Sequence, residues 1–178
     1  MSATQVPSAA EQAGMNLGGK YLTFGLAEEE YGLEILKVRE IIGMMGITPV
    51  PRTPPFVRGV INLRGNVIAV VDLRSKFGMA QADQTDQTCI IVVNVLALEI
   101  GIVVDKVLEV LDIASADIED SPSFGEMVNT DFILGMGKTD GHVTILLDIS
   151  RVLAEDMVRD LIPDGTEALV AEGELVTA

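Results

Sequence analysis

The side chains that most often carry covalent or metal-dependent chemistry are scarce in this sequence. It holds one histidine, His142, and one cysteine, Cys89. A zinc or iron site needs several His, Cys or carboxylate ligands at suitable spacing, and His142 instead follows Asp140-Gly141, a pair typical of turns. Cys89 stands in the apolar run 89–93, where a buried thiol behaves as a small hydrophobe. We therefore predict no metal site and no cofactor.

Motifs for phosphate binding and nucleophilic catalysis are also incomplete. Gly137-Lys138-Thr139 resembles the end of a phosphate-binding loop, but Phe132 stands where the first glycine of that motif belongs. Such a loop must also open a helix, whereas the following Asp140-Gly141 predicts a hairpin turn into a strand. The sequence contains no Gly-x-Ser-x-Gly elbow to present a nucleophile. These residues predict a binding protein rather than an enzyme.

The charge distribution restricts the partners. A formal net charge of −15 opposes binding to nucleic acid or to anionic lipid, because both require clustered Lys and Arg. The charge is uneven, since residues 31–79 carry seven basic and three acidic side chains and residues 80–178 carry four and twenty. This asymmetry is compatible with a solvated face or with a surface that orients protein partners.

Neither a membrane span nor a secretory signal is predicted. The most apolar stretch, residues 89–104, is interrupted by Asn94 and Glu99 and is shorter than the roughly 20 residues that a membrane helix needs. Residues 1–18 contain no basic residue and no continuous apolar run, so we predict a flexible N-terminal tail. The single cysteine fits a reducing cytoplasm.

The elements that would position a site are mainly strands. Alternating Leu22, Phe24 and Leu26 predict a half-buried strand, which an acidic turn joins to a second strand over residues 31–35. Residues 36–43 are compatible with a continued strand or with a short helix.

A second hairpin is predicted further along the chain. Prolines between residues 49 and 55 indicate a loop, and strands resume over residues 59–71 around a turn at Arg64-Gly65-Asn66. Residues 148–161 predict a short helix with one apolar side.

Two blocks of the sequence recur in the same order. Residues 31–41 (YGLEILKVREI) align with residues 100–110 (IGIVVDKVLEV), and residues 59–77 align with residues 135–153. Gly65 matches Gly141 and Asp72 matches Asp148. Two blocks in one order indicate duplication of a whole folding unit.

The repeat predicts the architecture. About five short strands per unit, joined by glycine-rich turns, would most simply curl into a small barrel. We predict a mostly β fold of two packed five-stranded barrels, one from each unit, with short helices and a C-terminal helix. The predicted divisions are the tail at 1–18, the two-barrel region at 19–154, and a C-terminal helix with an acidic tail at 155–178.

Several motifs, taken together, resemble the CheW family of bacterial chemotaxis coupling proteins. They are YGLEILKVREI, ITPVP, GVINLRG, VVDLRSKFG and GIVVDKVLEVL, and the resemblance extends over residues 20–153. It implies two SH3-like β-barrels and a non-catalytic adaptor. It also implies two partners in the cytoplasm, the regulatory domain of a chemotaxis histidine kinase and the cytoplasmic tip of methyl-accepting chemoreceptors, and recruitment to membrane receptor arrays.

The resemblance also implies contact residues. Val38, Glu40 and Arg64 match positions associated with receptor and signalling contacts, and Gly59 matches one linked to kinase binding. Arg64 could pair with Glu40 and fix the edge of a groove. Structural alternatives remain for each residue, since Val38 can be plain core, Gly59 can merely permit a turn, and an exposed Glu40–Arg64 pair can be worth little.

The repeat helps to separate the two interpretations at Arg64. Gly65 and Asp72 recur in the second unit, as expected of residues that build the fold, whereas Arg64 aligns with Asp140. We therefore hypothesise that Arg64 serves a partner surface present in one unit only. An enzyme and a small-ligand barrel are the alternatives to an adaptor, but no polar cluster inside an apolar run supports either.

Overall fold

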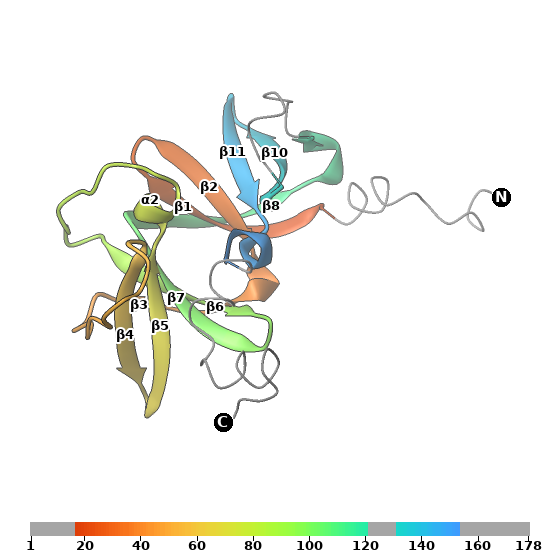
Figure 1. The fold of residues 1–178 in the computed structure, drawn as a ribbon. Helices are drawn as coiled ribbons and strands as arrows, with labels where there is room; N and C mark the ends of the chain where they lie inside the picture. The colour runs from red at the N-terminus through yellow and green to blue at the C-terminus, as the bar shows by residue number, and fades with distance from the viewer. Residues whose placement is uncertain (1–16, 121–130, 154–178) are drawn as a thin grey trace.

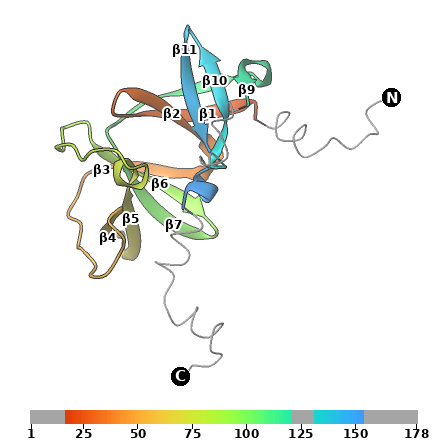
Figure 2. The same cartoon turned by 45° about the horizontal axis from the view of Figure 1, so that its top comes forward.

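Two β-sheets, called here sheet A and sheet B, contain nearly all the regular structure that the computed structural model describes, which covers residues 17–120 and 131–153 (Figure 1). Sheet A has the strand order β8-β1-β2-β11-β10-β9 and sheet B the order β3-β6-β7-β5-β4. In the views of Figures 1 and 2, the strands of sheet A lie above those of sheet B. The predicted mostly β, two-barrel fold is confirmed.

The strands are short and joined by tight turns. Sheet A comprises β1 (Gly19–Leu26), β2 (Glu29–Glu34), β8 (Lys106–Ile113), β9 (Ile118–Glu119), β10 (Ile133–Thr139) and β11 (His142–Leu147). Sheet B comprises β3 (Val38–Gly43), β4 (Val57–Leu63), β5 (Asn66–Asp72), β6 (Cys89–Val95) and β7 (Leu98–Val104). The short helices are η2 (Ile35–Lys37), α2 (Leu73–Lys76) and η3 (Ser115–Asp117).

Residues 36–43, which allowed a strand or a helix, contain both. The 3-10 turn η2 ends at Lys37, and strand β3 begins at Val38. At the other end of the described chain, residues 149–153 are helical, and the rest of the predicted helix to Leu161 lies outside the described residues. The predicted tails at 1–18 and 155–178 also lie outside them, apart from Leu17 and Gly18.

The internal repeat is visible in the strand register. Strands β2 and β11 run parallel, with Tyr31 opposite Ile145. Strands β5 and β7 also run parallel, with Ala69 opposite Ile100. In the sequence alignment Ile100 is the counterpart of Tyr31, and Ile145 is the counterpart of Ala69. The two sheets therefore reproduce the same pairing residue for residue.

The expectation that each sequence unit closes its own barrel is wrong. Strands β1 and β2 of the first unit lie in sheet A with the last strands of the second unit, while β6 and β7 of the second unit lie in sheet B with β3, β4 and β5. The chain crosses from sheet A to sheet B at η2, and it crosses back at Asp105, between β7 and β8. Each barrel is thus built from both units.

Burial on both faces explains why the units exchange hairpins. Ile90, Ile91, Val92 and Val93 in β6 are all completely buried, so this strand needs apolar cover on its two sides. A strand alternates its side chains between the two faces of a sheet. One face of β6 packs into the interior of the sheet B barrel and the other into a core shared with sheet A.

The shared core holds the two sheets together. Buried aliphatic side chains of β1, β2, β5, β6, β7 and the helical turn at 149–153 meet there, and each contributes roughly 1.5–3 kcal/mol through burial. Four stacked rings run along one side of it, with centroid separations of 5.9, 5.9 and 5.5 Å, in the order Phe24, Tyr31, Phe77 and Phe132. Phe77 follows α2 of sheet B, so the stack joins elements of both sheets.

Candidate partner-binding site at the edges of sheet B

Arg64 occupies a backbone position that ordinarily favours other residues. Arg64 and Gly65 form the two-residue turn between β4 and β5, with φ angles of 52° and 90°. Asp140 and Gly141 form the matching turn between β10 and β11, with φ angles of 43° and 82°. Such turns favour Asn-Gly and Asp-Gly, and a left-handed conformation costs other residues roughly 1–2 kcal/mol. The turn itself therefore gives no reason for an arginine at position 64.

The predicted pairing of Arg64 with Glu40 is confirmed. Arg64 Nη1 lies 3.3 Å from Glu40 Oε1, and Arg64 Nη2 pairs with Glu40 Oε2, which makes the contact bidentate. The hydrogen bonds from Arg64 hold the pKa of the Glu40 carboxyl below its usual value. Glu40 lies on β3 and Arg64 at the end of β4, the two edge strands of sheet B. The pair therefore links the two edges of the sheet across the mouth of its barrel.

The pair is asymmetric in exposure. The side chain of Glu40 is 29% exposed and that of Arg64 is 67% exposed. A bidentate contact fixes the plane of the guanidinium group, which leaves donor groups on its outer side facing solvent in a defined orientation. This arrangement suits recognition of a second acceptor on another molecule better than it suits stabilisation of the fold.

Val38 lies on the same strand as Glu40. It pairs with Val93, and a bulge separates it from Glu40 in the register. Its side chain is partly buried and packs against the shared core. The neighbouring Arg39 points its guanidinium to Glu99 at 3.1 Å. Val38 thus combines a packing role with partial exposure next to the Glu40–Arg64 pair.

Gly59 is set apart from these residues by a strict backbone requirement. Its φ is +141°, and a Cβ atom added there would lie 2.1 Å from the carbonyl oxygen of Thr48. Thr48 forms a bridge with Val60 that closes the sheet B barrel. The counterpart Gly135 is confined to a lesser degree, since its Cβ would lie 2.7 Å from Ile118 Cγ2 and 2.9 Å from the carbonyl oxygen of Glu119. A tight closure of each barrel explains a glycine at both positions.

Two exposed leucines were not found from the sequence. Leu36 in η2 is 93% exposed, and Leu96 in the β6–β7 turn is 59% exposed. The repeat could have indicated them, because Leu36 aligns with the charged Asp105 and Leu96 with the small Ala27. The first crossover, at η2, therefore carries two leucines at positions where the second crossover, at Asp105, carries an aspartate and an alanine.

An apolar cavity of about 430 Å³ opens beside Leu36. It is lined by Leu17, Tyr21, Ile35, Leu36 and the stems of Lys20 and Lys37. Burial and the nearby Glu34 carboxylate raise the pKa of the Tyr21 hydroxyl to about 12, and that hydroxyl donates a hydrogen bond to the carbonyl oxygen of Leu17. Glu34 also lines the cavity, and burial raises the pKa of its carboxyl above the usual value.

Residues 17–120 and 131–153 contain no cluster of three or more His, Cys, Asp or Glu side chains that could hold a metal ion. Within the same ranges, no helix is long and apolar enough to cross a bilayer.

Comparison with known proteins points to one family. The model of the CheW-like domain matches residues 20–157. The chemotaxis protein CheW of Klebsiella aerogenes is 38% identical over 144 residues, which cover 81% of this chain and 87% of the relative. CheW of Bacillus subtilis is 31% identical over 153 residues, covering 85% and 97%.

A solved structure agrees with these matches. The crystal structure of the scaffolding protein TtCheW from Thermoanaerobacter tengcongensis superposes with a TM-score of 0.73 and 36% sequence identity, covering 80% of this chain and 99% of that one. The motifs, the two-barrel fold and these matches agree, and the chain belongs to the CheW family of non-catalytic chemotaxis scaffold proteins.

Proposed function

We propose that this protein couples chemoreceptors to a chemotaxis histidine kinase by binding the cytoplasmic tip of methyl-accepting receptors and the regulatory domain of the kinase. It would act in the cytoplasm and be recruited to membrane receptor arrays. The observation that carries the proposal is Arg64, which stands in a left-handed turn position at an energetic cost, is held by Glu40, and is mostly exposed. A residue that opposes the local backbone preference and contributes little to packing is best explained by a partner.

We assign the receptor and signalling contacts to Val38, Glu40 and Arg64. Val38 offers apolar surface, and the Glu40–Arg64 pair offers oriented polar groups beside it. A receptor helix presents apolar and polar positions at fixed spacing, and it would match such a combination. For Gly59 we retain the kinase-contact prediction, although its close approach to Thr48 already accounts for the glycine.

The exposed leucines support a protein partner. Leu36 and Leu96 lie next to the crossover that leads into β3, and an exposed leucine gains about 25 cal/mol for each Å² that a partner removes from water. At the second crossover the matching positions, Asp105 and Ala27, are hydrogen-bonded to each other. The first crossover thus exposes apolar side chains at positions where the second crossover carries a polar and a small residue.

The test is the substitution Arg64→Asn. Asparagine favours the left-handed turn, so the melting temperature should stay the same or rise while the contact to Glu40 and its exposed donors are lost. Affinity for a soluble receptor-tip fragment, measured by titration calorimetry, should fall about tenfold, the equivalent of about 1.4 kcal/mol.

Asp140→Asn is the matched control, because it makes the same change in the equivalent turn of the second unit. It should leave both the affinity and the melting temperature unchanged. Unaltered receptor binding by the Arg64→Asn protein would refute the assignment of Arg64, and failure of the unsubstituted protein to bind either partner would refute the proposed function.

A further inference from the structure

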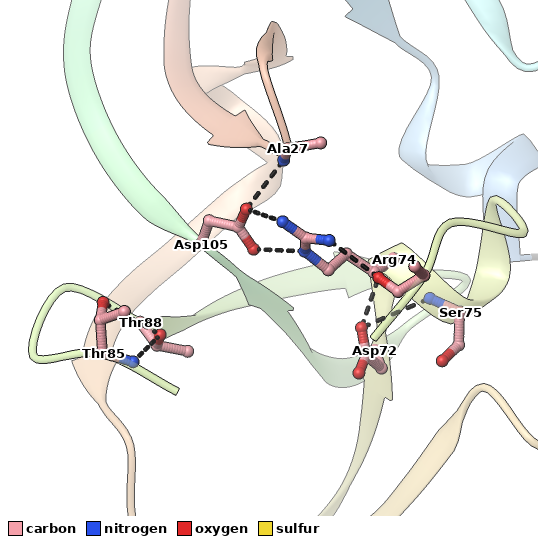
Figure 3. Close-up of polar contacts among 8 residues, drawn as sticks. Ala27, Asp72, Arg74, Ser75, Thr85, Thr88 and Asp105 are labelled. Atoms are coloured by element: carbon pink, nitrogen blue, oxygen red, sulfur yellow. Dashed lines mark hydrogen bonds and ion pairs between the residues drawn. The ribbon is translucent and has the colours of Figure 1, made fainter. Parts of the chain in front are cut away.

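The second crossover between the sheets is tied by a set of polar contacts (Figure 3). Asp105 Oδ1 accepts a hydrogen bond from Arg74 Nε at 2.9 Å, and Asp105 Oδ2 accepts one from Arg74 Nη2 at 2.7 Å. Oδ2 also accepts the backbone N–H of Ala27 at 2.8 Å. One carboxylate thus joins α2 of sheet B to the β1–β2 turn of sheet A.

The remaining groups of Arg74 are also positioned. Its Nη1 donates to the carbonyl oxygen of Ala80 at 2.8 Å, and its backbone N–H donates to Asp72 Oδ1 at 2.9 Å. Asp72 caps the first turn of α2 and is itself buried. The side chain of Arg74 is only 18% exposed. The guanidinium group is therefore held at both ends and does not behave as a mobile surface charge.

The contacts are favourable for the ionised carboxylate. The hydrogen bonds from Arg74, followed by that from Ala27, hold the pKa of the Asp105 carboxyl below its usual value. A bidentate, partly buried pair adds direction to an interaction, and this pair lies where the two sheets meet, in addition to the apolar packing of the shared core. The polar contacts thus constrain the relative orientation of the two sheets together with that core.

Among residues 17–120 and 131–153, the side chains that form these contacts have no equivalents at the first crossover. The counterparts of Arg74, Asp105 and Ala27 are Ser150, Leu36 and Leu96, which cannot form an ion pair. Figure 1 shows α2 and the η2 turn on different sides of the region where the sheets meet. The first crossover passes through the 3-10 turn η2 and the second through Asp105 alone. The difference in side chains separates a side tied by polar contacts from a side that exposes leucine.

We propose that Arg74 and Asp105 are positioning residues, which form a one-sided latch that holds the two barrels in a single relative orientation. The part of the proposal that concerns partners rests on the proposed function. A fixed geometry of the two barrels would let an adaptor that binds two proteins transmit the state of one partner to the other. The latch supplies that geometry from the side opposite to Leu36.

The direct test measures the distance between the barrels. Spin labels are placed on the full chain at Val67→Cys in β5 and Val143→Cys in β11, in a Cys89→Ala background, because both valines are exposed and stand at equivalent positions of the two sheets. Pulsed electron–electron double resonance spectroscopy then gives the distribution of distances between the two spin labels. Arg74→Lys keeps the charge but loses the bidentate contact, and it should broaden or shift this distribution.

The matched control is Lys138→Ala, which removes another 2.7 Å ion pair, to Glu119, that lies within sheet A. Its distance distribution should match that of the unsubstituted chain. Circular dichroism establishes that each variant is folded, and Asp105→Asn provides a second, nearly isosteric variant if Arg74→Lys is unstable. Coinciding distributions for the unsubstituted and latch variants would overturn the proposal, whatever the melting temperatures, because a merely stabilising pair would leave the distance unchanged.

A second measurement addresses the partners. The affinity for a kinase regulatory-domain fragment is measured with and without a saturating receptor-tip fragment. In the unsubstituted chain the receptor should change this affinity by a measurable factor, and in Arg74→Lys that factor should fall towards one while each separate affinity is kept. If coupling is unchanged in a variant whose distance distribution is broadened, the link between the latch and signalling is refuted. If the unsubstituted chain binds neither fragment, the proposed function is refuted, and the latch is then judged by the distance measurement alone.

Discussion

Two buried threonines inside the sheet A barrel differ in whether their hydroxyl groups are hydrogen-bonded, and this difference determines their contributions to stability. Thr23 and Thr144 are both completely buried. The Thr23 hydroxyl donates to the carbonyl oxygen of Glu109 at 2.8 Å and accepts the N–H of Glu109 at 3.1 Å. Among the described residues, Thr144 Oγ1 is a buried side-chain oxygen without a hydrogen-bond partner. The counterpart of Thr144 in sheet B is the aliphatic Ile68, so the hydroxyl is not required by the fold.

Replacing each threonine by valine should therefore have opposite effects. Thr144→Val removes an unpaired polar group and should raise the free energy of unfolding by about 1 kcal/mol, whereas Thr23→Val leaves the Glu109 amide unpaired and should lower it by about 1–3 kcal/mol. Urea denaturation of the two variants checks this. Loss of stability in Thr144→Val comparable to that in Thr23→Val would mean that the Thr144 hydroxyl is satisfied in solution.

At the scale of elements, the exchange of hairpins makes the barrels interdependent. Neither sheet can form from one sequence unit, because β1 and β2 complete one barrel and β6 and β7 the other. We expect one cooperative unfolding transition. Single tryptophan reporters at Val143→Trp in sheet A and Val67→Trp in sheet B should report the same urea midpoint, and two separated midpoints would show that the barrels unfold independently.

The strands and turns could be predicted from the sequence, but their partners could not. The alternation from Leu22 to Leu26, the Arg64-Gly65 turn and the repeat of Gly65 and Asp72 identified hairpins and a duplication. Alternation records which residues are buried and not which strand buries them, so the crossing of the chain at η2 and Asp105 was missed. A run buried on both faces, such as Ile90 to Val93, was the evidence that this hairpin lies between two cores.

The candidate site was also only partly predictable from the sequence. The resemblance to the CheW family singled out Glu40 and Arg64, and their opposite charges allowed the pairing that the structure shows. The aspartate at position 140 suggested the hypothesis that Arg64 serves a partner rather than the fold. Leu36 and the Arg74–Asp105 contacts were missed because their meaning depends on the three-dimensional position of the crossovers. Comparing the two units position by position after the fold was known revealed both.

For the whole molecule, we infer that the two barrels have diverged from a common unit and that the two sides of the adaptor have different functions. One crossover is fixed by Arg74 and Asp105, and the other exposes Leu36 near β3. The basic residues are concentrated in sequence between positions 31 and 79, within an acidic chain. Such a division favours simultaneous and distinct contacts to two protein partners.

The adaptor function is tested by the autophosphorylation rate of a chemotaxis histidine kinase reconstituted with receptor-containing membranes. Adding this protein should raise the rate only when receptors are present, and Arg64→Asn should raise it less than Asp140→Asn at equal concentration. A rate that stays at the level of kinase and receptors alone, under conditions where a reference coupling protein stimulates the same reaction, would contradict the adaptor function.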